Sequence, residues 1–294
     1  MPSRLVECVP NFSEGRDPAK VDAIEYAIRS AGAAVLDRTS DHDHHRSVIT
    51  FAGPPEIAAE AAFRAVRQAV YSIDLREHSG VHPRIGAADV VPFVPLSGVT
   101  LEDCARLAVE TGRRIWEELQ VPVYLYEAAA RRPESRNLAD VRRGRSAPDF
   151  GGPDHHASSG AVIVGARKFL IAFNVNLESS DVTIARQIAR AVRFSSGGLP
   201  YVKAVGVMLA SRNLAQVSMN LTDFEQTPIH VAFEAVRREA ERHGVGIAGT
   251  EIIGLVPKKA VEMAAAAGFR DENLNAGVVL ENRLAEEFAD TAGG

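Results

Sequence analysis

The alternation of apolar and polar positions predicts short strands separated by helices in the first part of the chain. Residues 5–9 are expected to form a strand, and Asp17 followed by Pro18 is typical of a helix start, with the helix running to Gly32. The β-branched run 47–51 follows a polar turn and indicates the return strand of a hairpin. Further strands are expected at 34–36, 90–94 and 121–126, and helices at 54–71 and 100–119. The predicted order is therefore βαββαβ, extended by one helix and one strand.

The same order of elements recurs in the second part of the chain. A polar stretch rich in arginine, proline and glycine, residues 131–159, is expected to be a long loop. After a strand at 161–164, strands are expected at 169–176, 202–209, 215–219 and 246–253, and helices at 181–192 and 228–243, before a helical tail. The repeated order predicts an α/β fold of the α+β sandwich kind, with two ferredoxin-like βαββαβ lobes side by side. The lobes are expected to be residues 1–179 and residues 180–294.

Composition and charge exclude several classes of protein. The chain has 294 residues, of which 46% are hydrophobic and 24% charged, so it is not a disordered, collagen-like or coiled-coil protein. Lys and Arg total 33 against 38 Asp and Glu, and the net charge of −5 predicts no nucleic-acid partner and requires a local basic site for any anionic ligand. Two cysteines, no secretory signal and no long apolar run indicate a soluble, cytoplasmic protein with no membrane partner.

A first candidate segment joins the first strand to the first helix. It carries Asn11, Ser13 and Glu14, an amide, a hydroxyl and a carboxylate directly before a helix start. Loops at such places bind polar ligands. The alternative interpretation is ordinary turn and capping chemistry.

A second candidate segment is the hairpin turn at residues 41–46, which contains Asp41, three consecutive or nearly consecutive histidines, and Arg46. Imidazole and carboxylate groups bind transition metals, and residues 154–156 offer a second set. The spacing matches no helical or other standard ligand pattern, and adjacent residues on a strand point to opposite faces. We therefore expect no metal here, and interpret the segment as either a solvated turn or part of a substrate cleft.

A third candidate segment, residues 78–89, lies between a helix and a strand. Pro83 restricts His82 to an extended conformation, and Gly80 and Gly86 allow close approach of the backbone. His82 is therefore either a proton shuttle presented to a cleft or a structural histidine in a loop.

A fourth candidate segment, residues 165–174, has Arg167 and Lys168 at the start of an apolar strand. Two cations beside aromatic rings suit a flat ligand that carries carboxylates. An exposed basic turn before a buried strand is the alternative.

Taken together, these segments resemble a known family. The stretches LVECVPNFSEG, HPRIGAADVVPFVPL, VPVYLYEAA, GARKFLIAFNVNL and NLAQVSMNL are similar to glutamate formimidoyltransferase, in the same order and over nearly the whole chain. The resemblance implies transfer of the formimino group from N-formimino-L-glutamate to N5 of tetrahydrofolate, with release of glutamate, in histidine degradation. It also implies a stand-alone transferase, because no chain remains for the cyclodeaminase part of the bifunctional relatives.

The resemblance further implies the architecture and the site. It predicts a homodimer whose N-terminal and C-terminal formiminotransferase subdomains enclose a folate cleft. Tetrahydrofolate is the co-substrate, His82 is the catalytic general acid/base, and no metal is needed. The folate-binding residues fall on Gly165, Ala166, Arg167, Lys168, Phe169, Leu170, Ile171, Ala172, Phe173 and Asn174. The candidates for substrate binding are Asn11, Ser13, Glu14, Arg46, Arg84, Asp37, Asp41 and Asp89. The last three, the aspartates, are also the candidate carboxylate partners of His82.

One departure from the family pattern concerns the hairpin turn. The family usually carries an asparagine directly before the arginine, where this chain has His45.

Two rival functions share the motifs: formyl transfer from N-formylglutamate to tetrahydrofolate, and folate binding without catalysis. Turnover with each donor distinguishes them.

Overall fold

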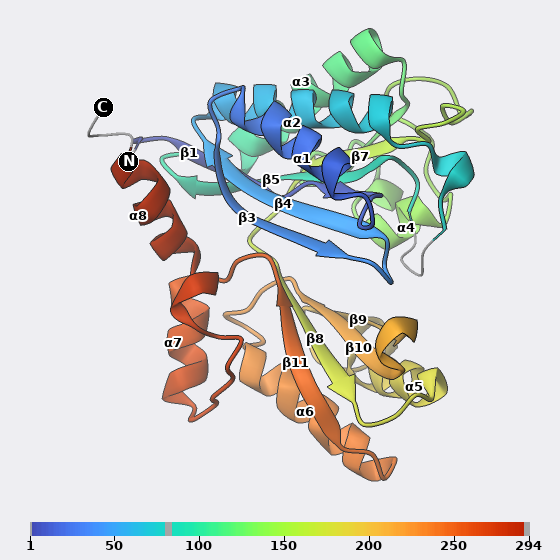
Figure 1. Ribbon diagram of the computed structural model, residues 1–294, viewed down its shortest axis with the longest axis vertical. Coiled ribbons are helices and arrows are strands. Elements are labelled where there is room, and N and C mark those ends of the chain that lie inside the picture. Colours follow the sequence, from blue (N-terminus) through green and yellow to red (C-terminus); the bar gives the residue numbers. More distant parts are fainter. Residues whose placement is uncertain (1, 80–83, 291–294) are drawn as a thin grey trace. The chain divides into compact units, whose positions relative to one another are not determined.

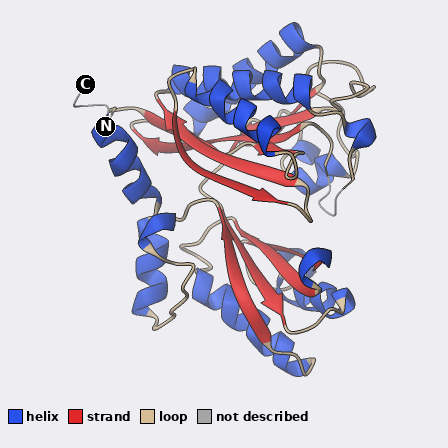
Figure 2. Cartoon of the chain, in the orientation of Figure 1, coloured by secondary structure: helices blue, strands red, loops and turns tan. Residues whose placement is uncertain are grey.

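The computed structural model describes residues 2–79 and 84–290 (Figure 1). Contacts within the chain divide these residues into two compact units, which separate between Lys168 and Phe169; the end of the chain, from Glu287, belongs to the first unit. In the described residues the fold is mixed α/β, with eight helices and two sheets, consistent with the expected α+β class (Figure 2). The sequence analysis predicted the boundary after residue 179, which is later in the chain than this separation. The predicted boundary lies beyond the first strand that pairs within the second unit.

The first unit is built on a seven-stranded sheet. Strand β4 pairs with β3 on one side and with β1 and β2 on the other, and β1 and β2 both pair with β5. These pairs are antiparallel, whereas β7 lies parallel to both β5 and β6. The strands are β1 Leu5–Cys8, β2 Asn11–Phe12, β3 Ala34–Asp41, β4 Arg46–Gly53, β5 Ala88–Ser97, β6 Val123–Glu127 and β7 Val162–Ala166.

Three long helices cover one face of this sheet (Figure 1). Their starts follow the sequence signals: Asp17 accepts a hydrogen bond from the N–H of Ala19, and Thr100 and Asp103 form a capping box. The core between helices and sheet includes four buried phenylalanines, Phe12, Phe51, Phe63 and Phe93. The helices are α1 Pro18–Arg29, α2 Pro55–Ser72 and α3 Leu101–Leu119.

The stretch expected to be a long loop is partly helical. It contains the short helix α4 Leu138–Arg142 and a 3₁₀ turn at Pro133–Ser135. Val141 of α4 packs with Tyr124 and Tyr126 of β6 in a separate small apolar cluster. This packing explains why the stretch is ordered although its sequence has no clear periodicity.

The second unit has a four-stranded antiparallel sheet in the order β11–β8–β10–β9. Residues of β8 alternate, so that Phe173 and Val175 lie in the core while Asn174 and Asn176 lie on the opposite face. As in the first unit, the first strand lies between the third and fourth strands of its βαββαβ run. The elements are β8 Ile171–Leu177, α5 Val182–Val192, β9 Val202–Leu209, β10 Leu214–Leu221, α6 Ile229–Arg242, β11 Ile247–Ile253, α7 Lys258–Ala266 and α8 Leu280–Asp290.

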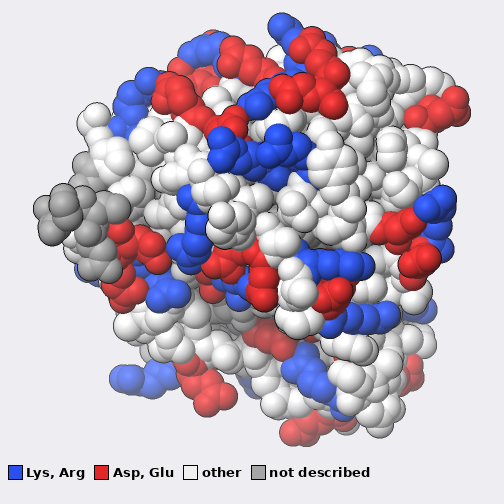
Figure 3. All heavy atoms as spheres, turned by 45° about the horizontal axis from the view of Figure 1, so that its top comes forward, with Lys and Arg blue, Asp and Glu red and all other residues white. Residues whose placement is uncertain are grey.

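Charged side chains of both signs are interspersed on the face drawn in Figure 3. None of the helices described is long and apolar enough to span a bilayer. The mixed surface agrees with the expectation that attraction of an anion has to come from a local group of cations.

Candidate functional site

The carboxylate of Glu14 lies in the turn between β2 and α1, where it is almost fully buried. Its Oε1 accepts hydrogen bonds from the backbone N–H groups of Gly15, Arg16 and Asp17, at 3.0, 2.9 and 3.0 Å. Burial by itself raises the pKa of Glu14, but the backbone hydrogen bonds and the His45 imidazole outweigh this effect and lower the pKa to about 2. The turn that leads into α1 therefore holds a negative charge at neutral pH.

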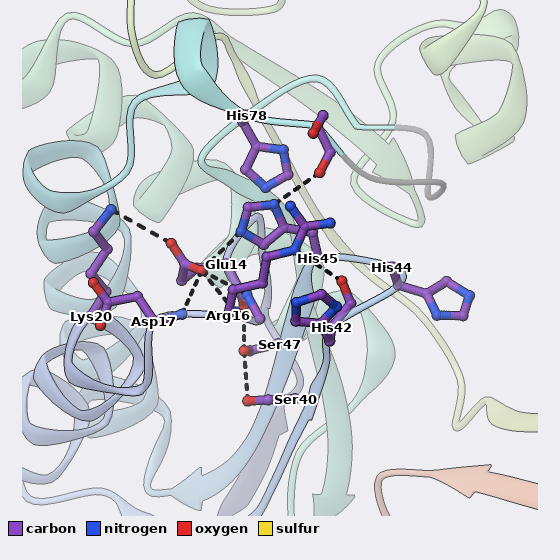
Figure 4. Close-up of polar contacts among 12 residues, drawn as sticks. Glu14, Arg16, Asp17, Lys20, Ser40, His42, His44, His45, Ser47 and His78 are labelled. Atoms are coloured by element: carbon purple, nitrogen blue, oxygen red, sulfur yellow. Dashed lines mark hydrogen bonds and ion pairs between the residues drawn. The ribbon is translucent and has the colours of Figure 1, made fainter. Parts of the chain in front are cut away.

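His45 connects this carboxylate to another part of the chain (Figure 4). Its Nε2 lies 3.0 Å from Oε1 of Glu14, and its Nδ1 lies 3.0 Å from the carbonyl oxygen of Ser79. The ring stacks on that of His78 with a centroid distance of 3.7 Å and an interplanar angle of 12°. His45 has a left-handed backbone, with φ of 49°, and is 9% exposed. Because both ring nitrogens face acceptors, both contacts are hydrogen bonds only when both nitrogens carry a proton.

Arg84 lies on the other side of His78. Its Nη1 lies 2.6 Å from Nε2 of His78, and its Nη2 donates to the carbonyl oxygen of His44 at 3.2 Å. Burial and the positive charge of Arg84 lower the pKa of His78 to about 4, so this ring is neutral at neutral pH and can accept from the guanidinium. Burial also lowers the pKa of Arg84.

His78 and Arg84 line a pocket of about 620 Å³ within the first unit. His155 also lines this pocket, and its Nε2 lies 3.1 Å from the hydroxyl of Tyr124. Arginine and neutral imidazole suit a ligand that brings carboxylates and exchanges protons. The lining residues are Leu75, Arg76, His78, Ser79, Arg84, Ile85, His155, His156, Ala157 and Gly160.

Two further candidate groups are buried together near this pocket. Asp89 forms an ion pair with Arg142 of α4 and accepts from the backbone N–H of Ile85 at 2.8 Å. Arg46 donates to the side-chain oxygen of Asn11. Burial lowers the pKa of Arg46 to about 10 against the opposing charge of Asp89, and the guanidinium stays charged at neutral pH.

Three other predicted substrate-binding residues make hydrogen bonds within the first unit. The hydroxyl of Ser13 donates to the carbonyl of Gly86, 73 residues along the chain, at 2.7 Å. Asp41 accepts from both the backbone and the ring of His44, at 2.6 and 2.8 Å, and so closes the hairpin turn. Asp37, on β3, accepts from the hydroxyl of Thr39 at 3.2 Å.

The predicted catalytic residue His82 lies outside the described residues. The nearest described residues on either side of it in the sequence are Ser79 and Arg84, and both line the pocket. The catalytic role of His82 therefore stays a prediction. The pocket is lined by Ser79 and Arg84, the residues between which the undescribed segment lies.

The predicted folate-binding segment contains the link between the two units. Gly165 and Ala166 end β7, and the residues from Ile171 onward form β8. A side chain at Gly165 would lie 2.3 Å from the ring of Tyr126, so only glycine fits there. Burial raises the pKa of Tyr126 to about 12 although Arg167, next to this ring, opposes the shift.

Some site residues were not predicted in these roles. Arg142 lies in the stretch interpreted as a loop, and Tyr124 lies within a strand, so neither carried a local signal of function. His155 was considered only as a metal ligand. In the described parts of the chain, no group of three or more His, Cys, Asp or Glu side chains is placed to hold a metal ion.

Comparison with known proteins finds one family along both units. The formiminotransferase N-terminal subdomain model matches residues 5–167, and the formiminotransferase domain model matches residues 172–286. The chain is 44% identical to a glutamate formimidoyltransferase of Streptococcus pyogenes, over 88% of this chain and 91% of that protein. It is 45% identical to a glutamate formimidoyltransferase of Thermoplasma acidophilum, over 95% and 97%. It is also 44% identical to the formimidoyltransferase-cyclodeaminase of Rattus norvegicus, over 90% of this chain and 52% of that protein.

The lowered pKa of Glu14 predicts a pH-dependent contribution to stability. The carboxylate stabilises the folded state at pH values above its ordinary pKa of 4.5, and this contribution is lost as the pH falls towards the folded-state pKa of about 2. Glu14→Gln removes the charge. The difference in free energy of unfolding between the wild type and this variant is expected to be on the order of 3 kcal/mol at pH 7 and to shrink below pH 4.5.

Urea unfolding of both proteins at pH 3, 4, 5 and 7 measures this difference. Glu117→Gln, at an exposed position of α3, is the matched control and should differ from the wild type by the same small amount at every pH. A difference for Glu14→Gln that does not change with pH would contradict the prediction.

Proposed function

The chain belongs to the formiminotransferase family of transferases, and from this premise we propose that it transfers the formimino group of N-formimino-L-glutamate to N5 of tetrahydrofolate. The observation that carries the proposal is 44–45% identity, over nearly the full length of both chains, to proteins named glutamate formimidoyltransferase. The products are 5-formimidoyltetrahydrofolate and L-glutamate.

The reaction requires two proton transfers. N5 of tetrahydrofolate attacks the amidine carbon, a C–N bond forms, and N5 then loses its proton. The bond from this carbon to the glutamate nitrogen breaks once that nitrogen has gained a proton. We assign the proton transfer to His82, as general acid/base.

The charges around the pocket support the choice of substrates. Formiminoglutamate and the glutamyl part of a folate both carry carboxylates, which a guanidinium binds with charge-assisted hydrogen bonds. Arg84 lines the pocket, and Arg46 is buried and charged. We propose Arg84 and Arg46, with Asn11, for binding of the formimino donor.

We propose a wider architecture on the same basis. Each unit is a ferredoxin-like lobe, which the position of the first strand between the third and fourth strands of each sheet supports. Folate binds along residues 165–174, and the protein acts as a cytoplasmic homodimer in histidine degradation.

A turnover assay tests the proposed function. Purified protein is incubated with tetrahydrofolate and either formiminoglutamate or N-formylglutamate, and release of glutamate and formation of the substituted folate are followed together. Turnover with formiminoglutamate is expected. Turnover with N-formylglutamate alone would assign the protein to formyl transfer, and binding of tetrahydrofolate with no turnover of either donor would make it a folate-binding module.

The two cations of the linking segment are expected to bind the folate carboxylates. The double variant Arg167→Ala, Lys168→Ala should weaken binding of a reduced folate, because desolvated charge-assisted hydrogen bonds contribute roughly 1.5–3 kcal/mol each. Titration calorimetry at low salt measures the affinity. The control removes another adjacent pair of cations, Lys258→Ala with Lys259→Ala on α7, and should leave the affinity unchanged; equal affinities for all three proteins would refute the assignment.

His82→Ala is expected to lower kcat by about two to four orders of magnitude, because the general acid/base is lost. Folate affinity should change little, since other groups bind the folate. In the wild type, the pH profile of kcat should show a limb near neutral pH that is absent in the variant. Persistence of that limb in His82→Ala would redirect the assignment to another group, and His243→Ala serves as the control for loss of an exposed histidine.

Exhaustive chelation is expected to leave the activity intact, because the proposed proton transfers need a general acid rather than a Lewis acid. The protein is treated with excess EDTA, desalted and assayed in chelated buffer. Loss of activity that one divalent ion restores would show that this expectation is wrong.

A further inference from the structure

The described ends of the segment that precedes β5 are both attached to the β3–β4 hairpin turn. On the near side, the carbonyl oxygen of Ser79 lies 3.0 Å from Nδ1 of His45. On the far side, Arg84 donates to the carbonyl oxygens of His44 and His45, at 3.2 and 3.4 Å. The turn therefore fixes two residues of the pocket wall, Ser79 and Arg84.

His45 also connects this turn to a rigid anchor. Its Nε2 lies 3.0 Å from Oε1 of Glu14, and three backbone N–H groups in the turn before α1 hold the same oxygen. Lys20, in the first turn of α1, lies 3.6 Å from the other carboxylate oxygen. A carboxylate held in this way cannot turn without losing several hydrogen bonds, so it sets the position of the His45 ring.

The stacked ring of His78 extends the same arrangement into the pocket. With 12° between the planes and 3.7 Å between centroids, a shift or tilt of His45 displaces His78 as well. His78 and Ser79 are neighbours in the chain and line the pocket together. Figure 4 shows the Glu14, His45 and His78 side chains in one continuous group, with the ring of His44 pointing away from it.

We propose that Glu14 and His45 form a positioning pair for the pocket, in which His45, held by Glu14, keeps Ser79 and His78 in place. His45 does not contact substrate in this proposal; it acts through the two residues that it holds. The kinetic tests of this proposal measure the rate of formimino transfer, so in this respect it rests on the proposed function.

Loss of the pair should change the rate more than it changes substrate binding. A small displacement of groups that surround the reacting atoms lowers the rate by up to roughly 100-fold, whereas contacts distributed over the rest of a substrate keep its affinity. His45→Ala is therefore expected to lower kcat by about 10- to 100-fold and to change KM by less than about threefold. His45→Gln has a single amide nitrogen in place of two ring nitrogens, so its kcat should fall between that of His45→Ala and that of the wild type.

Chemical rescue distinguishes positioning from a general loss of stability. The space vacated in His45→Ala lies between a carboxylate, a carbonyl and the face of His78, which are the partners of an imidazole. Added imidazole should restore most of the lost kcat in His45→Ala and should not do so in the double variant Glu14→Gln, His45→Ala. His42→Ala removes an exposed imidazole from the same turn and should behave as the wild type with and without imidazole.

Amide hydrogen exchange gives a measurement that does not depend on turnover. His45→Ala should speed exchange in a peptide covering residues 75–79, while His42→Ala should not. If the wild type shows no transfer but this difference in exchange is present, the proposed function fails and the positioning pair stands. Unchanged kcat and unchanged exchange in His45→Ala, or a loss of kcat that imidazole does not relieve in a folded variant, would overturn the proposal.

Discussion

The arrangement of the site depends on the hydrogen bonding of the buried Glu14 carboxylate. A buried charge is costly unless it is fully hydrogen-bonded, and Oε1 of Glu14 accepts from three backbone N–H groups and faces a ring nitrogen of His45. The backbone donors, Gly15, Arg16 and Asp17, belong to the turn that leads into α1. Because His45 links this carboxylate to Ser79, the helix start, the hairpin turn and the pocket wall depend on one another.

Most of the fold follows from signals that are local in the sequence. Asp17 with Pro18, and Thr100 with Asp103, mark helix starts through hydrogen bonds to nearby N–H groups, so the sequence alone could predict them. Strand β2 has two residues, too few for any periodicity, and is defined by its pairing with β4 and β5. Helix α4 is similar: it has five residues and is stabilised by contact with β6.

The sequence could supply candidate residues for the site but not their contacts. Glu14 was identified as a candidate because polar groups in loops beside strands and helix starts tend to bind ligands, and Arg84 because the substrates that the resemblance implies are anionic. Their partners are distant in the sequence: Glu14 and His45 are 31 residues apart, and Asp89 and Arg142 are 53 apart. Such pairs form only through tertiary structure, and the hydrogen bond from Ser13 to Gly86, 73 residues away, could not be predicted for the same reason.

The protonation states of the pocket follow from the same packing. Arg84 donates to two backbone carbonyls and lies against His78. Because burial and the positive charge of Arg84 lower the pKa of His78 to about 4, the ring does not add a second cation to the pocket at neutral pH. Glu14, although negative, has its charge directed to the start of α1 and to His45 rather than to the pocket. An acidic protein thus keeps a cationic guanidinium in its pocket wall, where a carboxylate of a substrate finds a partner that is already partly desolvated.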